Sequence, residues 1–224
     1  MSPRQPDPQV RLQLVEAAAR LLDGHGIDGV TARGLATAIG ASTQAVYTHF
    51  ERMDDVIAEV WREGFRRFGA ALDEPAISDD PVADFMTQGW GYRRFALHNP
   101  HLYRVMFGAG MVAMHQGVAD DLEAASSTFL SLLTRIDRCR GAGRWQVEDV
   151  YLAGEMVWST VHGHTSIELT GYFAGLERDP VASYTECLRR IDLGFGDDPE
   201  QGRRSVRSAR RRAQRADLAV AAQN

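Results

Sequence analysis

The run from Ser42 to Phe50 carries side chains suited to contact with base edges and phosphates. It reads Ser-Thr-Gln-Ala-Val-Tyr-Thr-His-Phe. A Gln side chain can pair with adenine, hydroxyl groups can bind bases or phosphates, and an Ala methyl group can contact thymine. Val46 and Phe50, four residues apart, lie on one side of a helix and can face a core. The residues predicted to contact DNA in this run are Ser42, Thr43, Gln44, Ala45, Tyr47 and His49.

Two short helices separated by a tight turn must position these side chains. Thr31 is a good N-cap, and Leu35 and Ile39 give the helix that follows it one apolar side. Gly40 can adopt the left-handed conformation that ends this helix. Ser42 then caps the helix with the polar side chains. Two helices arranged in this way form a helix-turn-helix, for which the partner is double-stranded DNA.

This pattern resembles the TetR family of transcriptional regulators over about residues 10–65. The resemblance rests on several features together: an amphipathic first helix, a Gly-rich joint at 24–29, Thr31 with Arg33, Leu35-Ala36, Gly40, Ser42, Tyr47-x-His49-Phe50 and an acidic-apolar fourth helix. It implies that Thr31 and Arg33 also belong to the DNA interface. Farther along the chain, Trp158 with His162-Gly163 looks like one branch of TetR C-terminal domains.

One position departs from the family pattern. Many TetR proteins have Lys where this chain has Met53, and that Lys commonly contacts phosphate at the start of the fourth helix. Arg52 lies one position earlier and has a longer reach and a forked guanidinium group. We therefore expect Arg52 to supply the phosphate contact.

The charged residues limit the kind of site that the chain can hold. Its 224 residues include 25 basic side chains, all of them Arg, and 30 acidic ones, for a net charge of −5. The lack of Lys excludes a P-loop lysine, a lysine Schiff base and a lysine general base. A negative total does not exclude DNA, because only one surface need meet phosphate. Residues 1–54 nevertheless hold five Arg against six acidic residues, so affinity must depend on a few placed groups and on dimerisation.

The sequence indicates no catalytic, cofactor or metal site. It has no nucleophile elbow and no Gly-rich phosphate loop. His162 and His164 are two residues apart, so on a helix they point to different sides and cannot readily share one ion. Cys139 and Cys187 are interpreted as reduced packing thiols. Because no apolar run approaches the roughly 18 residues that span a bilayer, and no signal peptide is evident, we expect a cytoplasmic protein with no membrane partner.

Helical periodicity continues along the chain without a strand pattern, so the expected fold is all-α. We expect a helix-turn-helix DNA-binding domain at 1–52 and a ligand-binding and dimerisation domain at 53–196. The Arg-rich segment 197–224 has too little apolar content to pack and is predicted to be a disordered or intermittently helical tail. Its charge is interpreted as solvated, with weak nonspecific attraction to DNA as the alternative. The other helices are expected at about 53–72, 81–98, 118–140, 147–170 and 179–195, with a short one after Pro100 and a Met-bearing loop at 108–117.

A stripe on the helix at 179–195 fits a seam between helices. Its apolar residues alternate spacings of three and four, which is typical of helices that pack at shallow angles. In TetR proteins the corresponding helix pair forms a four-helix bundle with a second subunit, so we expect a homodimer through this stripe. The alternative is that the stripe closes the subunit's own core. The stripe comprises Val181, Tyr184, Leu188, Ile191 and Phe195.

Aromatic and Met side chains of the larger domain could line an apolar cavity with few polar groups, as small-molecule sites often are. The alternative is a solid core, because protein interiors are close-packed. The residues assigned to a ligand site are Phe85, Trp90, Met106, Phe107, Met111, Phe129, Trp158 and His162.

Together these features predict a homodimeric transcriptional regulator, most simply a repressor that binds a palindromic operator and is released by a small apolar molecule. The motif predicts DNA binding, whereas repression and ligand response are implied by the family resemblance. Two alternatives stay open: an enzyme that uses the helical cavity, and a ligand-independent architectural DNA binder. The second is distinguishable because a ligand without differential affinity for two states would leave DNA binding unchanged.

Overall fold

In the computed structural model, the described residues are 7–74, 76–108 and 119–221, and all regular structure within these ranges is helical. The all-α prediction is therefore confirmed. The chain divides into two compact units, residues 1–67 with 99–125 and residues 68–98 with 126–224. Two of the boundaries fall inside the long helices α4 (Met53–Asp73) and α8 (Ala119–Gly141). Within the described ranges, no helix is both long and apolar enough to cross a membrane.

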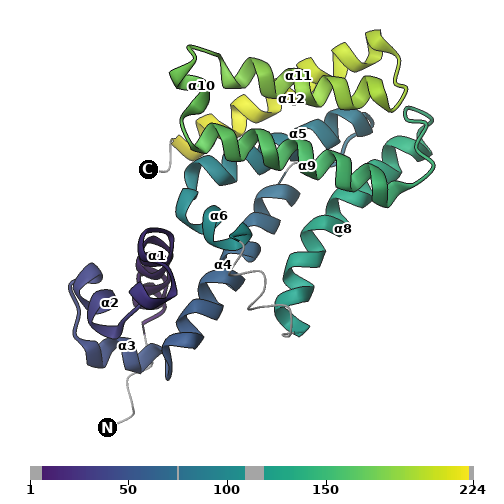
Figure 1. Ribbon diagram of the computed structural model, residues 1–224. Coiled ribbons are helices and arrows are strands. Elements are labelled where there is room, and N and C mark those ends of the chain that lie inside the picture. The colour runs from purple at the N-terminus through teal and green to yellow at the C-terminus, as the bar shows by residue number, and fades with distance from the viewer. Residues whose placement is uncertain (1–6, 75, 109–118, 222–224) are drawn as a thin grey trace. The chain divides into compact units, whose positions relative to one another are not determined.

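The first unit is built on an N-terminal helix whose inner face covers the short helices that follow it. Asp7 caps this helix by accepting a hydrogen bond from the backbone N–H of Gln9 at 2.9 Å, and Pro8 occupies the first turn. The unit's elements are α1 (Pro8–His25), the 3-10 helix η1 (Ile27–Gly29), α2 (Ala32–Ile39), α3 (Thr43–His49), the first part of α4, and α6 (Pro100–Phe107) (Figure 1). Its core includes Leu14, Val15, Ala18, Leu35, Val46, Phe50, Val56 and Val60.

Helix α6 belongs to the first unit because it packs on α1 and α4. Asp23 of α1 accepts a hydrogen bond from Nδ1 of His101 at 2.6 Å and also pairs with Arg104. A Cβ atom on Gly64 would lie only 2.7 Å from Sδ of Met106, so the glycine allows α6 to approach α4 closely. These contacts join a segment near residue 100 to the N-terminal helices.

Helix α5 (Pro81–His98) is the central helix of the second unit. Its residues 81–88 are all buried, and it contacts α9 (Val150–Leu169), α11 (Pro180–Gly194) and α12 (Pro199–Ala221) (Figure 1). The short helix α10 (Tyr172–Gly175) packs on α9. A Cβ atom on Gly91 would clash with the carbonyl oxygen of Ala71, so glycine is needed where α5 meets the end of α4.

The C-terminal segment, predicted to be a disordered or intermittently helical tail, is instead the continuous helix α12, which covers residues 199–221 and packs along α5. The buried face of α12 is made of small side chains, which contribute little apolar area but allow the two backbones to approach closely. Apolar content alone does not reveal this kind of packing. The small residues that face inward are Gly202, Ser205, Ala209 and Ala213.

Candidate nucleic-acid interface and effector site

The helix-turn-helix forms with the caps expected from the sequence. The hydroxyl oxygen of Thr31 accepts a hydrogen bond from the backbone N–H of Gly34 at 3.1 Å, which starts α2. Gly40 ends α2 with φ 67° and ψ 31°, the left-handed conformation that favours glycine. Ser42 accepts from the backbone N–H of Ala45 at 3.2 Å and starts α3. The turn between the two helices therefore has a defined geometry.

Helix α3 presents a polar face to solvent. Val46 and Phe50 are buried, whereas the side chains of Thr43, Gln44 and Tyr47 are exposed. Tyr47 is 52% exposed, which is a large fraction for an aromatic side chain. Ala45 and His49 are half-buried, and Ser42, Thr31 and Arg33 are exposed. The structure thus places the residues assigned to DNA contact on α2 and α3, on or at the edge of their solvent-facing sides.

A residue that the sequence analysis did not assign, Arg11 of α1, holds the end of α3. Its guanidinium group donates to the backbone carbonyl of His49 at 3.0 Å and lies over the Phe50 ring, 4.4 Å from the ring centroid. It also pairs with Glu59 of α4 at 3.1 Å. Arg11 therefore ties α1, α3 and α4 together behind the exposed face. No local sequence signal marks it, because its role depends on contacts between distant residues.

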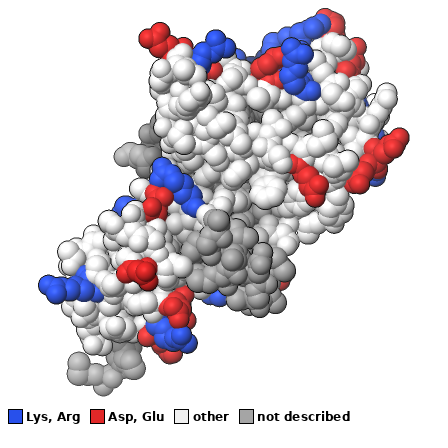
Figure 2. Space-filling model, viewed as in Figure 1, with Lys and Arg blue, Asp and Glu red and all other residues white. Residues whose placement is uncertain are grey.

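Arg52 lies in the bend between α3 and α4. Its guanidinium group pairs with Asp54 at 2.7 Å, and its backbone N–H donates to the Asp55 carboxylate at 2.9 Å. Both members of the Arg52–Asp54 pair are mostly exposed, so the pair contributes little to stability and can be exchanged for a phosphate. Figure 2 shows basic and acidic side chains interspersed on the face that it draws, without one broad basic patch over the first unit.

The described residues assigned to a ligand site belong to both units. Met106 and Phe107 belong to the first unit, where Met106 is buried and Phe107 contacts Phe65 at 5.8 Å between ring centroids. In the second unit, Phe85 contacts Trp145 (4.8 Å) and Trp90 contacts Tyr184 (5.1 Å), on different parts of α5. Met111 lies outside the described residues. Among the described residues of the second unit, Phe129, Trp158 and His162 are joined by ring contacts.

These three residues belong to what we call the Tyr92–His162 cluster. Phe129 lies 6.1 Å from Trp158, and Trp158 lies 5.9 Å from His162, between ring centroids. The hydroxyl group of Tyr92 is 2.9 Å from Nδ1 of His162, and burial lowers the pKa of His162, so the ring is held neutral. Tyr92, which the sequence analysis did not assign, supplies the polar group of the cluster. The members of the cluster are Phe68, Tyr92, Phe95, Phe129, Trp158 and His162.

Thr165, one turn after His162 on α9, is a second polar feature. It is fully buried, and its hydroxyl oxygen has no hydrogen-bond partner within the described part of the chain. A buried polar group without a partner costs free energy, so such groups are often found where a ligand or water binds. Helices α8 and α9 approach closely about three turns earlier on α9, because a Cβ atom on Gly154 would lie 2.5 Å from Leu133.

The predicted dimer seam on α11 is wrong for its two central residues. Tyr184 and Leu188 are 0% and 2% exposed and pack against α5, where the Tyr184 hydroxyl donates to the carbonyl oxygen of Gly89 at 2.5 Å. Their stripe closes the subunit's own core, which was the alternative interpretation. Val181, Ile191 and Phe195 are half-buried, and Phe195 contacts Trp145. Amphipathicity alone could not distinguish the two interpretations.

An exposed apolar face lies instead on α9 and α10. Large apolar side chains there are open to solvent, and among the 20 residues of α9 only Glu155 and Glu168 carry a formal charge at neutral pH. A helix that is apolar on all sides is normally buried on all sides. The exposed residues of this α9–α10 face are Tyr151, Leu152, Met156, Trp158, Ile167, Tyr172 and Leu176.

Two family models match the chain. One, described as "Bacterial regulatory proteins, tetR family", matches residues 14–60, and the other, described as "Tetracyclin repressor-like, C-terminal domain", matches residues 85–191. With the helix-turn-helix described above, these matches define a DNA-binding regulator of transcription. More narrowly, the chain belongs to the TetR family. Proteins of this family bind DNA, usually as dimers, respond to small-molecule effectors and are not enzymes. The assignment to a Trp-His-Gly branch stays a prediction.

Individual proteins are also similar to this chain. An uncharacterised HTH-type transcriptional regulator of Mycobacterium tuberculosis, Rv0681, is 27% identical over 188 residues, which cover 83% of this chain and 81% of the relative. The TetR family regulator PfmR of Thermus thermophilus has a TM-score of 0.61 at 21% identity, over 68% of this chain and 84% of its own. A gamma-butyrolactone receptor (ArpA-like protein) has a TM-score of 0.63 at 19% identity, over 93% and 98%. At such identities the two solved structures show the fold alone.

Proposed function

We propose that the chain is a homodimeric repressor that binds a palindromic operator and releases it when a mainly apolar small molecule binds. The observation that carries the proposal is the exposed polar face of α3, held from behind by Val46, Phe50 and Arg11. A single short recognition helix reads few base pairs, so two copies on two half-sites are needed for useful specificity. The proposal separates into three parts, each with its own test.

The first part is that Arg33, Gln44 and Tyr47 read or anchor the operator. Gln44 can make two hydrogen bonds to adenine, and loss of such a contact costs about 1–3 kcal/mol of binding free energy. We therefore expect Gln44→Ala or Arg33→Ala to weaken binding to a selected operator by roughly 5- to 150-fold and to change binding to scrambled DNA far less. Gln13→Ala, an exposed glutamine of α1, is the matched control. Equal losses on both duplexes would show that these side chains do not read bases.

Tyr47 and His49 are assigned to phosphate, and so is Arg52 after it leaves Asp54. Loss of a phosphate contact weakens binding evenly across sequences and reduces the slope of log K against log salt by about one. Arg52→Ala should therefore lower this slope by about one, measured by titration at several salt concentrations. An unchanged slope would leave Arg52 as a surface partner of Asp54.

The second part is that the α9–α10 face binds the same face of a second copy. The face is apolar, α9 carries no Arg, and Leu152 and Met156 lie on it at helical spacing, so its exposure in a lone subunit is unfavourable. We expect Met156→Glu to give monomers in sedimentation experiments. Ile77→Glu, which changes an isolated exposed residue in the same way, should leave dimers. A dimeric Met156→Glu protein would place the interface elsewhere.

The third part is that the effector binds beside the Tyr92–His162 cluster. The aromatic rings offer apolar contact, and the Tyr92 hydroxyl, the His162 ring and the buried Thr165 hydroxyl offer a few polar contacts, which suits a small molecule that carries one or two polar groups. A compound that releases the protein from DNA in a screen should lose coupling in the Trp158→Ala protein, while DNA binding without the compound stays largely intact. Unchanged effector affinity and coupling in a folded Trp158→Ala protein would assign Trp158 to packing only.

A further inference from the structure

The outward face of α12 is strongly cationic. Its positions 203, 207, 211 and 215 are four residues apart, so their side chains follow one line along the helix. The opposite face holds the small residues that pack on α5. Helix α12 is regular from residue 199 to 221 (Figure 1). Its basic side chains therefore have a fixed order along the helix. The residues of this Arg face are Arg203, Arg204, Arg207, Arg210, Arg211 and Arg215, all of them exposed.

Most of this charge is not neutralised by the protein itself. Arg203 and Arg204 share Glu200, at 3.4 and 3.7 Å, in the first turn of α12. The other four Arg side chains have no acidic group within 4.0 Å among the residues that the structure describes. Several other Arg residues of the second unit, namely Arg140, Arg189 and Arg190, do pair with a neighbouring carboxylate. The four unpaired side chains are Arg207, Arg210, Arg211 and Arg215.

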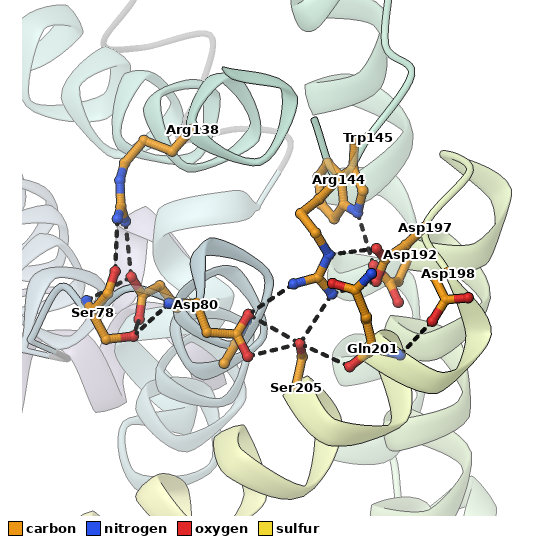
Figure 3. Close-up of polar contacts among 12 residues, drawn as sticks. Ser78, Asp80, Arg138, Arg144, Trp145, Asp192, Asp197, Asp198, Gln201 and Ser205 are labelled. Atoms are coloured by element: carbon orange, nitrogen blue, oxygen red, sulfur yellow. Dashed lines mark hydrogen bonds and ion pairs between the residues drawn. The ribbon is translucent and has the colours of Figure 1, made fainter. Parts of the chain in front are cut away.

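The inner face of α12 is fixed by a network that leaves the Arg face outward. The Ser205 hydroxyl lies between the carboxylate of Asp80 (2.8 Å) and the guanidinium group of Arg144 (3.2 Å), which also binds Asp197 (Figure 3). Farther along, Arg212 turns inward and donates to the fully buried carboxylate of Asp84 at 2.8 Å. The seven Arg residues of α12 thus divide into one that fastens the helix and six that point to solvent.

We propose that the Arg face of α12 binds the phosphate backbone of double-stranded DNA, as a second contact that does not depend on base sequence. The row from Arg203 to Arg215 is roughly 18 Å long, from the rise of an α-helix. Duplex DNA carries one negative charge per about 1.7 Å of its axis, so a row of this length meets several phosphates. Arg is also well suited to this role, because its fork matches phosphate with two hydrogen bonds.

The same geometry favours DNA over a membrane surface. A basic helix that lies on a bilayer inserts an apolar face beside its basic one. In α12 the face opposite the Arg residues is small-sided and already packed on α5, so no large apolar side chain between residues 203 and 215 is free to insert. Duplex DNA is also a polyanion that proteins of this family bind. This second contact adds affinity for any duplex without reading it.

The test is a full-length variant with the four unpaired residues replaced, Arg207→Gln, Arg210→Gln, Arg211→Gln and Arg215→Gln. Binding of a labelled random-sequence duplex is measured by fluorescence anisotropy over a series of NaCl concentrations. Each lost phosphate contact reduces the slope of log K against log salt by about 0.9, so we expect a reduction of roughly 2–4. A slope equal to that of the wild-type protein would overturn the proposal. Circular dichroism must show that α12 remains helical, and a matching Arg→Lys variant should keep most of the slope.

A control variant removes the same net charge from other parts of the second unit, with Gln in place of Arg140, Arg178, Arg189 and Arg190. It should keep the wild-type slope, and an equal reduction there would show that only total charge matters. A Gln44→Ala, Tyr47→Ala protein should lose its preference for the operator but keep the part of the salt slope that α12 contributes. This variant therefore distinguishes a wrong assignment of the helix-turn-helix contacts from a wrong inference about α12. Loss of binding to phosphatidylserine vesicles in the four-Gln protein, with an unchanged DNA slope, would assign the face to lipid and overturn the inference.

Discussion

The carboxyl group of Asp192 gives the sharpest test of the packing of the second unit. Asp192 is 0% exposed, and its Oδ1 accepts a hydrogen bond from the indole N–H of Trp145 at 2.8 Å. Its Oδ2 has no partner within the described residues. A Cβ atom on Gly202 would clash with this oxygen and lie 3.3 Å from Oδ2 of Asp197, so the two carboxyl groups converge there. Burial, with the neighbouring Asp197, raises the pKa of Asp192 from its ordinary value of 3.8 to about 7.

The direction of the pH effect follows from this raised pKa. Between pH 3.8 and about pH 7, the folded protein keeps a proton on Asp192 that the unfolded chain releases. The free energy of unfolding therefore falls as pH rises through this range. Each unit of pKa difference corresponds to about 1.4 kcal/mol of stability. From about pH 5 to about pH 7, which is two units, the free energy of unfolding should fall by roughly 2–3 kcal/mol. The groups that face Asp192 and set this value are Trp145, Asp197 and Arg144.

Asp192→Asn is the corresponding perturbation. The amide oxygen can still accept from Trp145, and its NH₂ group can donate to Asp197, as a protonated carboxyl group would. In urea unfolding at fixed protein concentration, the stability of Asp192→Asn relative to wild type should rise by roughly 2–3 kcal/mol between about pH 5 and pH 8. Asp149→Asn, at the exposed N-cap of α9, removes a carboxylate where Asn caps equally well and should show no such trend. A difference that does not change with pH would refute the reasoning.

Further substitutions test the same unit. Gly202→Ala places a methyl group against Asp192 and should lower stability by about 1–3 kcal/mol in thermal unfolding. Gly194→Ala, whose Cβ meets nothing within 4 Å, should not lower stability. Equal melting temperatures of the two variants would contradict the close approach of Gly202 to Asp192. Asp84 accepts hydrogen bonds from Ser78, Arg138 and Arg212, which outweigh burial and lower its pKa, so its contribution to stability is present near neutral pH and is lost in acid. Asp84→Asn should lower stability by about 2–3 kcal/mol at neutral pH and by less in acid. The loss at neutral pH is smaller than for a fully buried pair because both Arg partners are partly exposed. A neutral effect in urea unfolding would show that α12 is held by its small residues alone.

Local signals in the sequence were sufficient to predict the DNA-binding motif. The caps at Thr31 and Ser42 and the left-handed Gly40 act through hydrogen bonds within a few residues, so their geometry can be read from spacing. Arg11 could not be found in this way, because it stabilises α3 from a helix more than thirty residues earlier.

The second unit was less predictable because its helices are amphipathic without identifying their partners. The stripe around Tyr184 and Leu188 was correctly read as apolar, but it packs on α5 within the same subunit. The tail was misread because Ala209 and its small neighbours bury little area and still pack closely. The Tyr92–His162 pair joins two helices seventy residues apart, and no spacing rule predicts it.

The central claim is that two copies of the chain read a two-fold symmetric DNA site through α3. It is tested most directly by selecting bound duplexes from a random pool with the full-length protein and weighing the resulting complexes by sedimentation. We expect inverted repeats with half-site centres about 34–36 Å apart, or a multiple of this spacing, and an even number of chains on each duplex. We also expect Gln44→Ala to change the base preference within each half-site. Enrichment of a single half-site bound by one chain, or no enriched sequence at all, would contradict it.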